Sequence, residues 1–392
     1  MKENERRIRA TLGEANAPEE SQAEERAWRV VQAAYAEQPA RRRPARLRRR
    51  GLQLALVLGL LAALISPAGA AVRHWVADTV DPGREPSKPA LTSLPTSGSL
   101  LVQSAAGPWV VHADGSKRLL GAYAGATWSP HGLFVAATSG HELVTVDPRG
   151  EAHWTVDQTA LASRPSWNGP DGFRLAYLSG ASLHIVDGDG SHDHMLEPRV
   201  AAVTPAWLPG PRYVLAFARP NGAVAVVQIG TGKTVFETAP GARPLSLQWS
   251  AKDRLLITTP EDAEIRAGDG ARVWRWDAPP GTRIVATRLA PGHEQVALIV
   301  SSRTRSRLLL TGPEAQSRAL FSGPGLFSGV EWSPDGRWLL LAWKSADQWL
   351  FLNPSRPRRI DAISHIGAQF APGASRPGRA GFPQVRGWCC PH

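Results

Sequence analysis

The sequence predicts an all-β fold, a seven-bladed β-propeller, preceded by a cytoplasmic helical arm and one transmembrane helix. A short segment, in which an aromatic residue or leucine precedes a small residue, proline and glycine, returns seven times at intervals of 38 to 43 residues. Repeats near 40 residues are typical of propeller blades, each a four-stranded sheet. The aromatic or leucine residues of these segments, here called the anchors, are Trp128, Trp167, Trp207, Trp249, Leu289, Trp332 and Phe370.

Each interval between anchors contains apolar runs that suit strands. An apolar run such as 133–138 follows the anchor turn, a second run such as 142–147 comes next, and a shorter run such as 152–156 ends the repeat. Valine, leucine, isoleucine and aromatic residues fill these runs, while Gly, Asp, Asn and Pro separate them, as hairpins require. Together with the anchor strand, each interval therefore predicts four antiparallel strands.

The two ends of the repeat predict how the ring closes. Residues 98–121 supply three strands of a blade without an anchor strand, and the last anchor, Phe370, has no strands after it. Joining the two incomplete units completes one blade and removes the free strand edges that favour aggregation. We therefore expect the propeller at residues 98–373 and a C-terminal tail at 374–392. Residues 73–97, rich in proline and serine, are expected to be a linker.

The transmembrane prediction depends on residues 51–72, a segment of 22 residues without a charged side chain. A helix of that length crosses a hydrocarbon core of about 30 Å. Seven arginines within residues 41–50 precede it and only Arg73 follows closely, which predicts a cytoplasmic N-terminus and an extracytoplasmic propeller on a single-pass plasma-membrane protein. The arginine block is expected to contact anionic headgroups rather than nucleic acid. A signal peptide cleaved near residues 68–70 is the alternative.

Residues 1–50 are expected to form the cytoplasmic arm. Within it, residues 18–37 have a helical pattern that places Trp28, Val31 and Tyr35 on one face. Two interpretations remain open: the helix rests on the membrane or on a neighbouring helix, or it binds a cytoplasmic protein.

The best preserved anchor segment is Trp-Ser-Pro-Asp-Gly at 332–336. It resembles the repeat of TolB-like and related WD-repeat-like propellers, and the likeness extends over residues 98–373. In those propellers the Asp-Gly pair forms the turn between the first and second strands, and this pair remains here at 171–172 and 335–336. The whole layout also resembles membrane-anchored propeller proteins of actinobacterial type. These resemblances imply a fold rather than a ligand.

Three polar motifs resemble ligand sites, and a hairpin turn is the preferred interpretation for the first two. Residues 230–234 resemble a phosphate-binding loop but lack its first glycine, because Val227 occupies that position. The aspartates within 187–193 resemble part of a calcium loop, without its late glutamate. The two histidines of 192–194 lack further zinc ligands. No metal or cofactor is therefore predicted.

The chain contains two cysteines, Cys389 and Cys390, next to each other near the C-terminus. A disordered tail is expected there, and the body of the propeller is expected to contain no disulfide. A bond within the pair, a bond between chains, and a metal site that includes His392 are the alternatives.

The leading functional prediction is a non-enzymatic binding or scaffold module for protein, peptide or envelope ligands. Loops at one mouth of the central channel are expected to meet the ligand, although the sequence identifies no catalytic or contact residue. One alternative is an anti-sigma-like transmembrane regulator with the propeller as its sensor. The other is a propeller hydrolase, which would need acidic residues that converge in the channel.

Overall fold

The computed structural model describes residues 93–169, 173–356, 360–371 and 381–390. The chain divides into two compact units, residues 1–59 and 60–392, and every described residue belongs to the second. The predicted arm and transmembrane helix, and nearly all of the predicted linker, lie outside the described residues. Among the residues that are described, no helix has the length and apolar character needed to cross a membrane.

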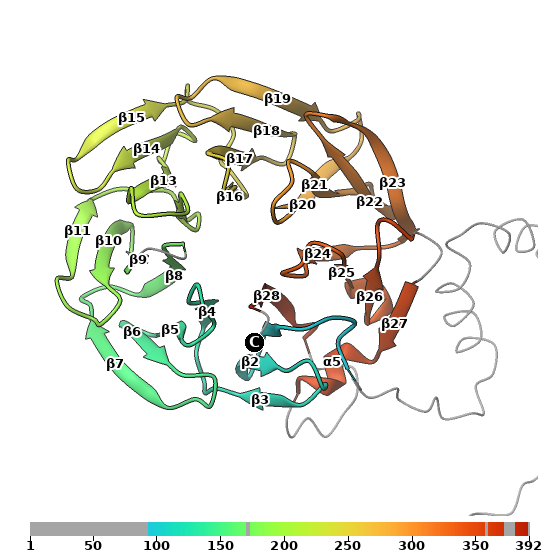
Figure 1. The fold of residues 1–392 in the computed structure, drawn as a ribbon, viewed down its shortest axis with the longest axis horizontal. Helices are drawn as coiled ribbons and strands as arrows, with labels where there is room; N and C mark the ends of the chain where they lie inside the picture. Colours follow the sequence, from blue (N-terminus) through green and yellow to red (C-terminus); the bar gives the residue numbers. More distant parts are fainter. Residues whose placement is uncertain (1–92, 170–172, 357–359, 372–380, 391–392) are drawn as a thin grey trace, which may run out of the picture. The chain divides into compact units, whose positions relative to one another are not determined.

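Seven four-stranded antiparallel sheets are arranged around one axis, which confirms the predicted seven-bladed propeller (Figure 1). The strands of each blade are given from the axis outward. Blade 1 contains β28 (Gln384–Cys389), β1 (Ser99–Ser104), β2 (Gly107–Val111) and β3 (Lys117–Leu119). Blade 2 contains β4 (Gly125–Trp128), β5 (Val135–Ser139), β6 (Glu142–Val146) and β7 (Ala152–Asp157). Blade 3 contains β8 (Ala162–Trp167), β9 (Arg174–Ser179), β10 (Ser182–Asp187) and β11 (His194–Glu197).

The remaining blades repeat this order. Blade 4 contains β12 (Ala206–Trp207), β13 (Val214–Ala218), β14 (Val224–Gln228) and β15 (Lys233–Glu237). Blade 5 contains β16 (Ser246–Trp249), β17 (Arg254–Thr258), β18 (Asp262–Ala267) and β19 (Arg272–Asp277). Blade 6 contains β20 (Arg283–Leu289), β21 (Val296–Ser301), β22 (Arg305–Gly312) and β23 (Ala315–Pro324). Blade 7 contains β24 (Phe327–Trp332), β25 (Leu339–Trp343), β26 (Gln348–Leu352) and β27 (Ile360–Ser364), with the short helices η1 (Lys344–Ala346) and α5 (Ile366–Gln369).

The hydrophobic core lies between neighbouring blades. The second strand of every blade is almost wholly buried, because its sheet packs against a sheet on each side, whereas the outermost strands are mainly exposed. Leu101 of blade 1, for example, packs in one cluster with Val135 and Val144 of blade 2. Residues buried on both faces must be apolar without alternation, which is why the second strands read as continuous apolar runs in the sequence.

The anchors end the inner strands. Trp128, Trp167, Trp207, Trp249, Leu289 and Trp332 are the last residues of β4, β8, β12, β16, β20 and β24. The Asp-Gly pair at 335–336 forms the turn between β24 and β25, as predicted, and Gly336 adopts a positive φ of 67° that disfavours other residues. Ser333 Oγ donates a hydrogen bond of 2.5 Å to Asp335 in this turn.

The predicted closing segment requires a correction. Strand β28 comes from residues 384–389, within the predicted tail, and it pairs with β1 so that Leu100 lies opposite Trp388. Phe370 follows α5 and is buried, with its ring centroid 5.3 Å from that of Trp349. Phe370 therefore packs on the outer part of the sheets, and Trp388, the penultimate residue of β28, is the aromatic residue at the end of the seventh inner strand. A predicted propeller boundary at 373 is too early.

Candidate functional site

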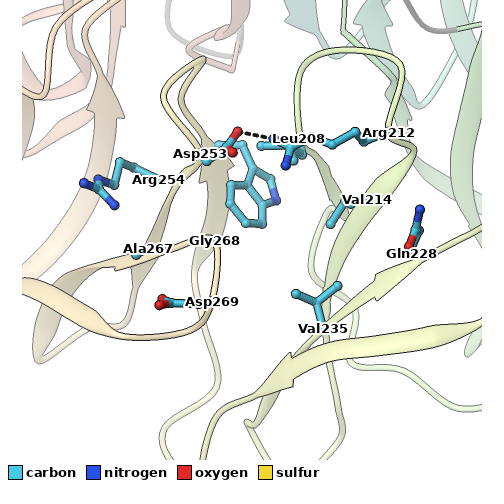
Figure 2. Close-up of a pocket in the computed structure, with 11 residues that line it drawn as sticks. Leu208, Arg212, Val214, Gln228, Val235, Asp253, Arg254, Ala267, Gly268 and Asp269 are labelled. Atoms are coloured by element: carbon cyan, nitrogen blue, oxygen red, sulfur yellow. Dashed lines mark hydrogen bonds and ion pairs between the residues drawn. The ribbon is translucent and has the colours of Figure 1, made fainter.

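A cavity of about 510 Å³ lies between blades 4 and 5. We call it the blade 4–5 groove. Its lining comes from the turn between β12 and β13, the turn between β16 and β17, and the turn between β18 and β19 (Figure 2). These turns all lie on the face of the ring that carries the anchor turns, because alternate strand connections of an antiparallel sheet emerge on the same side.

The floor of the blade 4–5 groove is apolar. Leu208, Val214 and Trp249 line it, and all three are buried in the interface between the two blades. Val235, on the outermost strand of blade 4, also lines the groove and remains 41% exposed. Val235 thus extends the apolar floor of the groove to the solvent. An apolar group of a partner can bury this side chain.

The rim of the groove carries both signs of charge. Arg212 of blade 4 forms an ion pair with Asp253 of blade 5, and Figure 2 shows this pair spanning the groove. Arg254 Nε lies 3.3 Å from Glu294 Oε1 of blade 6. The exposed Arg212–Asp253 pair contributes only about 0–1 kcal/mol to stability, so its charges can pair with a partner instead at small cost.

The indole of Trp249 leaves a buried donor unused. Trp207 Nε1 donates to the carbonyl oxygen of Ser166 at 2.9 Å, and Trp332 Nε1 donates to the carbonyl oxygen of Arg288 at 3.3 Å, so each ties its blade to the preceding one. Among the described residues, Trp249 Nε1 has no acceptor. The N–H groups of Trp128 and Trp167 also lack one, but neither side chain lines the groove.

Sequence reasoning did not identify these groove residues. The Asp-Gly pair is lost from the anchor turns at 206–210 and 248–253, but it is lost from 127–132 and 288–292 as well, so this signal does not single out the groove. That loss marks turns that have diverged from the repeat, but only the packing of the blades shows that the turns at 206–210 and 248–253 border one cavity.

Two of the three polar motifs form hairpin turns, as expected. Residues 230–232 lie in the turn between β14 and β15, residues 233–234 begin β15, and the Gly232 amide donates to the carbonyl oxygen of Gln228. Residues 187–193 join β10 to β11, where Asp189 Oδ1 accepts hydrogen bonds from the amide and hydroxyl of Ser191. Throughout the described ranges, no three His, Cys, Asp or Glu side chains are close enough to hold a metal ion.

Asp193, from the same motif, has a structural role. Tyr177 is completely buried, and its hydroxyl donates a 2.6 Å hydrogen bond to Asp193 Oδ1. Gln158 Nε2 donates to Asp193 Oδ2 at 2.9 Å, and His184 Nδ1 lies 3.6 Å from the same oxygen. Burial raises the pKa of Tyr177, and the hydrogen bond and charge of Asp193 raise it further. Asp193 therefore accepts the hydrogen bond of the buried Tyr177 hydroxyl, which stays protonated in the core of blade 3.

Replacing this carboxylate tests that role. We expect Asp193→Ala to destabilise the protein by about 1–3 kcal/mol, because the buried hydroxyl of Tyr177 loses its acceptor. Urea unfolding measures the loss. Asp189→Ala, which removes an exposed turn carboxylate four residues away, is the matched control and should cost less than about 1 kcal/mol. Equal effects of the two changes would contradict the assignment.

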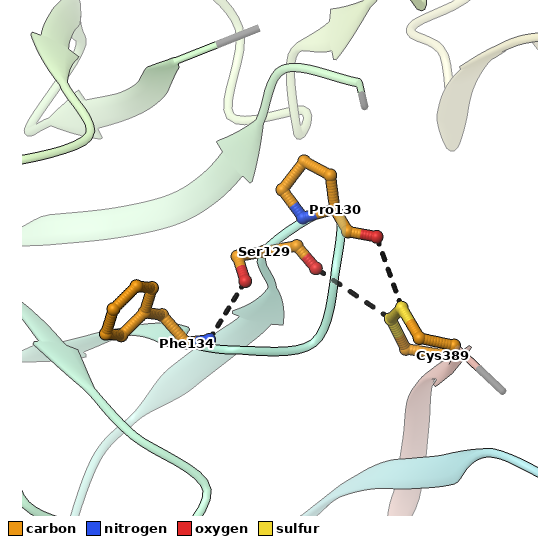
Figure 3. The surroundings of a disulfide bond; sticks show 5 residues. Ser129, Pro130, Phe134 and Cys389 are labelled. Carbon is orange, nitrogen blue, oxygen red and sulfur yellow. Dashed lines mark hydrogen bonds between the residues drawn. A yellow bond between two sulfur atoms is a disulfide. The ribbon is translucent and has the colours of Figure 1, made fainter. Parts of the chain in front are cut away.

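The two cysteines lie at the C-terminal end of β28. Cys389 and Cys390 form a disulfide with each other, which corrects the expectation of a disordered tail at these two residues and selects one of the alternatives (Figure 3). Cys389 Sγ lies 3.8 Å from the carbonyl oxygen of Ser129, and Cys390 Sγ lies 3.1 Å from that of Pro130. The pair thus contacts the anchor turn of blade 2, next to the junction of the two chain ends.

Comparisons with known proteins support the fold. No protein family matches the sequence, and no curated protein is similar to it in sequence. Among solved structures, Hsv2 of Kluyveromyces lactis is similar with a TM-score of 0.54 and 12% identity, over 68% of this chain and 96% of that one. The C-terminal WD40 domain of Sif2 gives 0.51 and 15%, over 69% and 83%. A chain of the mitotic checkpoint complex gives 0.50 and 17%, over 67% and 92%. At these identities the similarity establishes a WD40-like propeller fold and nothing further.

Proposed function

We propose that this protein is a non-enzymatic binding module, and that the blade 4–5 groove holds a peptide segment of a protein partner. The observation that carries the proposal is an apolar floor, open to solvent at Val235, beneath a rim with the Arg212–Asp253 pair. Protein-recognition sites combine a buried apolar centre with a polar rim in this way. A volume of about 510 Å³ accommodates a few side chains of an extended segment.

The polar groups of the groove suit a peptide as well. An incoming carbonyl oxygen is an acceptor of the kind that Trp249 Nε1 lacks, and basic or acidic side chains can pair with Asp253 or Arg212. The WD40-like fold agrees with this proposal, since rigid propellers present their loops to partners. The membrane prediction completes the proposal: the uncharged segment 51–72 would display the groove outside the cytoplasm of a single-pass protein.

A peptide library tests this function. The full-length chain, purified with a mild detergent, is panned against a phage-displayed library of random dodecapeptides, and the affinities of enriched peptides are measured by fluorescence anisotropy. We expect Val235→Asp to weaken their binding at least tenfold, because it places a charge on the apolar floor.

Val273→Asp is the matched control for this change. Val273 lies on the outermost strand of blade 5 and is 43% exposed, close to the 41% of Val235, but it does not line the groove. Binding should be unchanged in this variant. The proposal is wrong if no peptide is enriched over a bare-matrix selection, or if the two variants weaken binding equally.

A further inference from the structure

The inner strands of the propeller carry an unusual set of charges. Their sequences contain no lysine, histidine or aspartate in the part of the chain that the structure describes. The charged residues on these seven strands are Arg164, Arg283, Arg288, Glu331 and Arg386. The strands nearest the axis, which Figure 1 shows, therefore carry four arginines and one glutamate.

Three of these arginines lie on the innermost strands of three different blades. Arg386 lies on β28 of blade 1, Arg288 on β20 of blade 6, and Arg164 on β8 of blade 3. Blade 7 lies between blades 1 and 6, and blade 2 lies between blades 1 and 3. Arg386 can therefore approach Arg288 and Arg164 only across the axis. Burial lowers the pKa of Arg386, and the positive charges of Arg164 and Arg288 lower it further.

The positive charges are only partly compensated. Arg288 Nε lies 2.8 Å from Glu331 Oε2, so this pair is neutral as a unit. Neither Arg164 nor Arg386 forms an ion pair or hydrogen bond with another described residue. Arg164 and Arg386 are both exposed to solvent, so water screens part of their mutual repulsion, and a bound anion would remove what remains of it.

A cavity of about 400 Å³ adjoins Arg386. Tyr123, Phe382 and Gln103 are among its lining residues. Gln103 Nε2 donates to the carbonyl oxygens of Tyr123 at 2.9 Å and Ser104 at 3.2 Å, which fixes the amide and leaves Gln103 Oε1 buried without a donor. The site thus offers a charged donor, an unused acceptor and two aromatic rings, with room for more than an inorganic ion.

We propose that the axis of the propeller binds a phosphate group, held by Arg386 and Arg164 with Arg288 beside them. Guanidinium groups match oxyanions in charge and in the fork of their N–H donors. A phosphate monoester carries between one and a half and two negative charges at neutral pH, which balances the two uncompensated arginines. The site is distinct from the blade 4–5 groove and does not depend on the function proposed for it.

Thermal unfolding of the full-length chain in detergent tests this site. Inorganic phosphate and glycerol 3-phosphate are titrated separately, and sodium chloride keeps the ionic strength constant because salt alone screens the repulsion. We expect both probes to raise the melting temperature in a saturable way. A free ion as the source predicts equal affinities, whereas an ester source predicts tighter binding of glycerol 3-phosphate, whose organic part fills the cavity beside Tyr123 and Phe382.

Substitutions that each remove one charge test whether the arginines at the axis bind the phosphate. Arg386→Gln and Arg164→Gln should each weaken phosphate binding at least tenfold, and Arg386→Gln should also raise the melting temperature without phosphate, because it relieves the repulsion. Arg307→Gln removes the same charge from an exposed position on β22, the third strand of blade 6, and should change neither quantity. If Arg386→Gln does not fold, Arg164→Gln alone carries the test.

The proposal fails if phosphate stabilises no more than chloride at equal ionic strength. It also fails if Arg307→Gln weakens binding as much as Arg164→Gln does. Because the groove variant Val235→Asp leaves the axis intact, its phosphate response should equal that of the unaltered chain, which separates this test from that of the proposed function.

Discussion

Ending the chain at residue 383 is expected to abolish stable folding of the propeller. The truncation removes β28, which pairs with β1 from Ser99 to Gln103 and buries Trp388 against the core of blades 1 and 7. Loss of a buried tryptophan side chain alone costs about 3–5 kcal/mol, against a total stability of roughly 5–15 kcal/mol for a typical domain. The free edge of β1 would also invite pairing between molecules.

Circular dichroism and size-exclusion chromatography measure this effect. We expect the shortened chain to lack a cooperative thermal transition and to elute as aggregates. A chain that ends at residue 390 retains β28 and the disulfide and should match the full-length protein. Cooperative melting of the 383 truncation at the temperature of the full-length chain would instead support ring closure near Phe370.

Removing the carboxylate of Glu331 should give the second largest loss. Glu331 joins blade 7 to blade 6 through Arg288, and its charge raises the pKa of that guanidinium. Glu331→Gln leaves the partly buried Arg288 without its carboxylate partner and with the like charge of Arg386 nearby. Breaking a buried pair costs about 3–5 kcal/mol, and because the Arg288 side chain is 29% exposed we expect about 2–3 kcal/mol in urea unfolding.

A double-mutant cycle provides the control. Arg288→Gln together with Glu331→Gln removes both charges and should recover stability to within about 1 kcal/mol of the unaltered chain. A loss below about 0.5 kcal/mol for Glu331→Gln alone would mean that the pair behaves as an ordinary surface ion pair. Phosphate should stabilise Glu331→Gln more than the unaltered chain if the axis binds an anion.

The local repeat was sufficient to predict most of the fold. An anchor, an apolar run and a turn describe interactions within one blade, and these recur wherever a blade recurs. Six anchors, from Trp128 to Trp332, were therefore placed correctly, and so were the three strands supplied by residues 98–121. The polar motifs at 187–193 and 230–234 were also interpreted correctly as hairpin turns, because their spacing fits tight turns better than ligand loops.

The seventh anchor shows where local pattern fails. Phe370 precedes alanine, proline and glycine, so its surroundings in the sequence resemble an anchor turn. Trp388 is followed by two cysteines, and it lies 56 residues after Trp332, outside the usual interval. Pairing of β28 with β1 joins segments from opposite ends of the propeller, and no local pattern encodes which late segment reaches that edge.

The sequence by itself determined the number of blades, the strands within them and the turns between them, because these depend on interactions among residues close along the chain. Only the tertiary structure decided the closing strand, the blade 4–5 groove and the placement of Arg164, Arg288 and Arg386 on inner strands around one axis. Each of these brings together residues from different blades, often more than a hundred positions apart. Their proximity follows from the closure of the ring, which is a property of all seven sheets packed together.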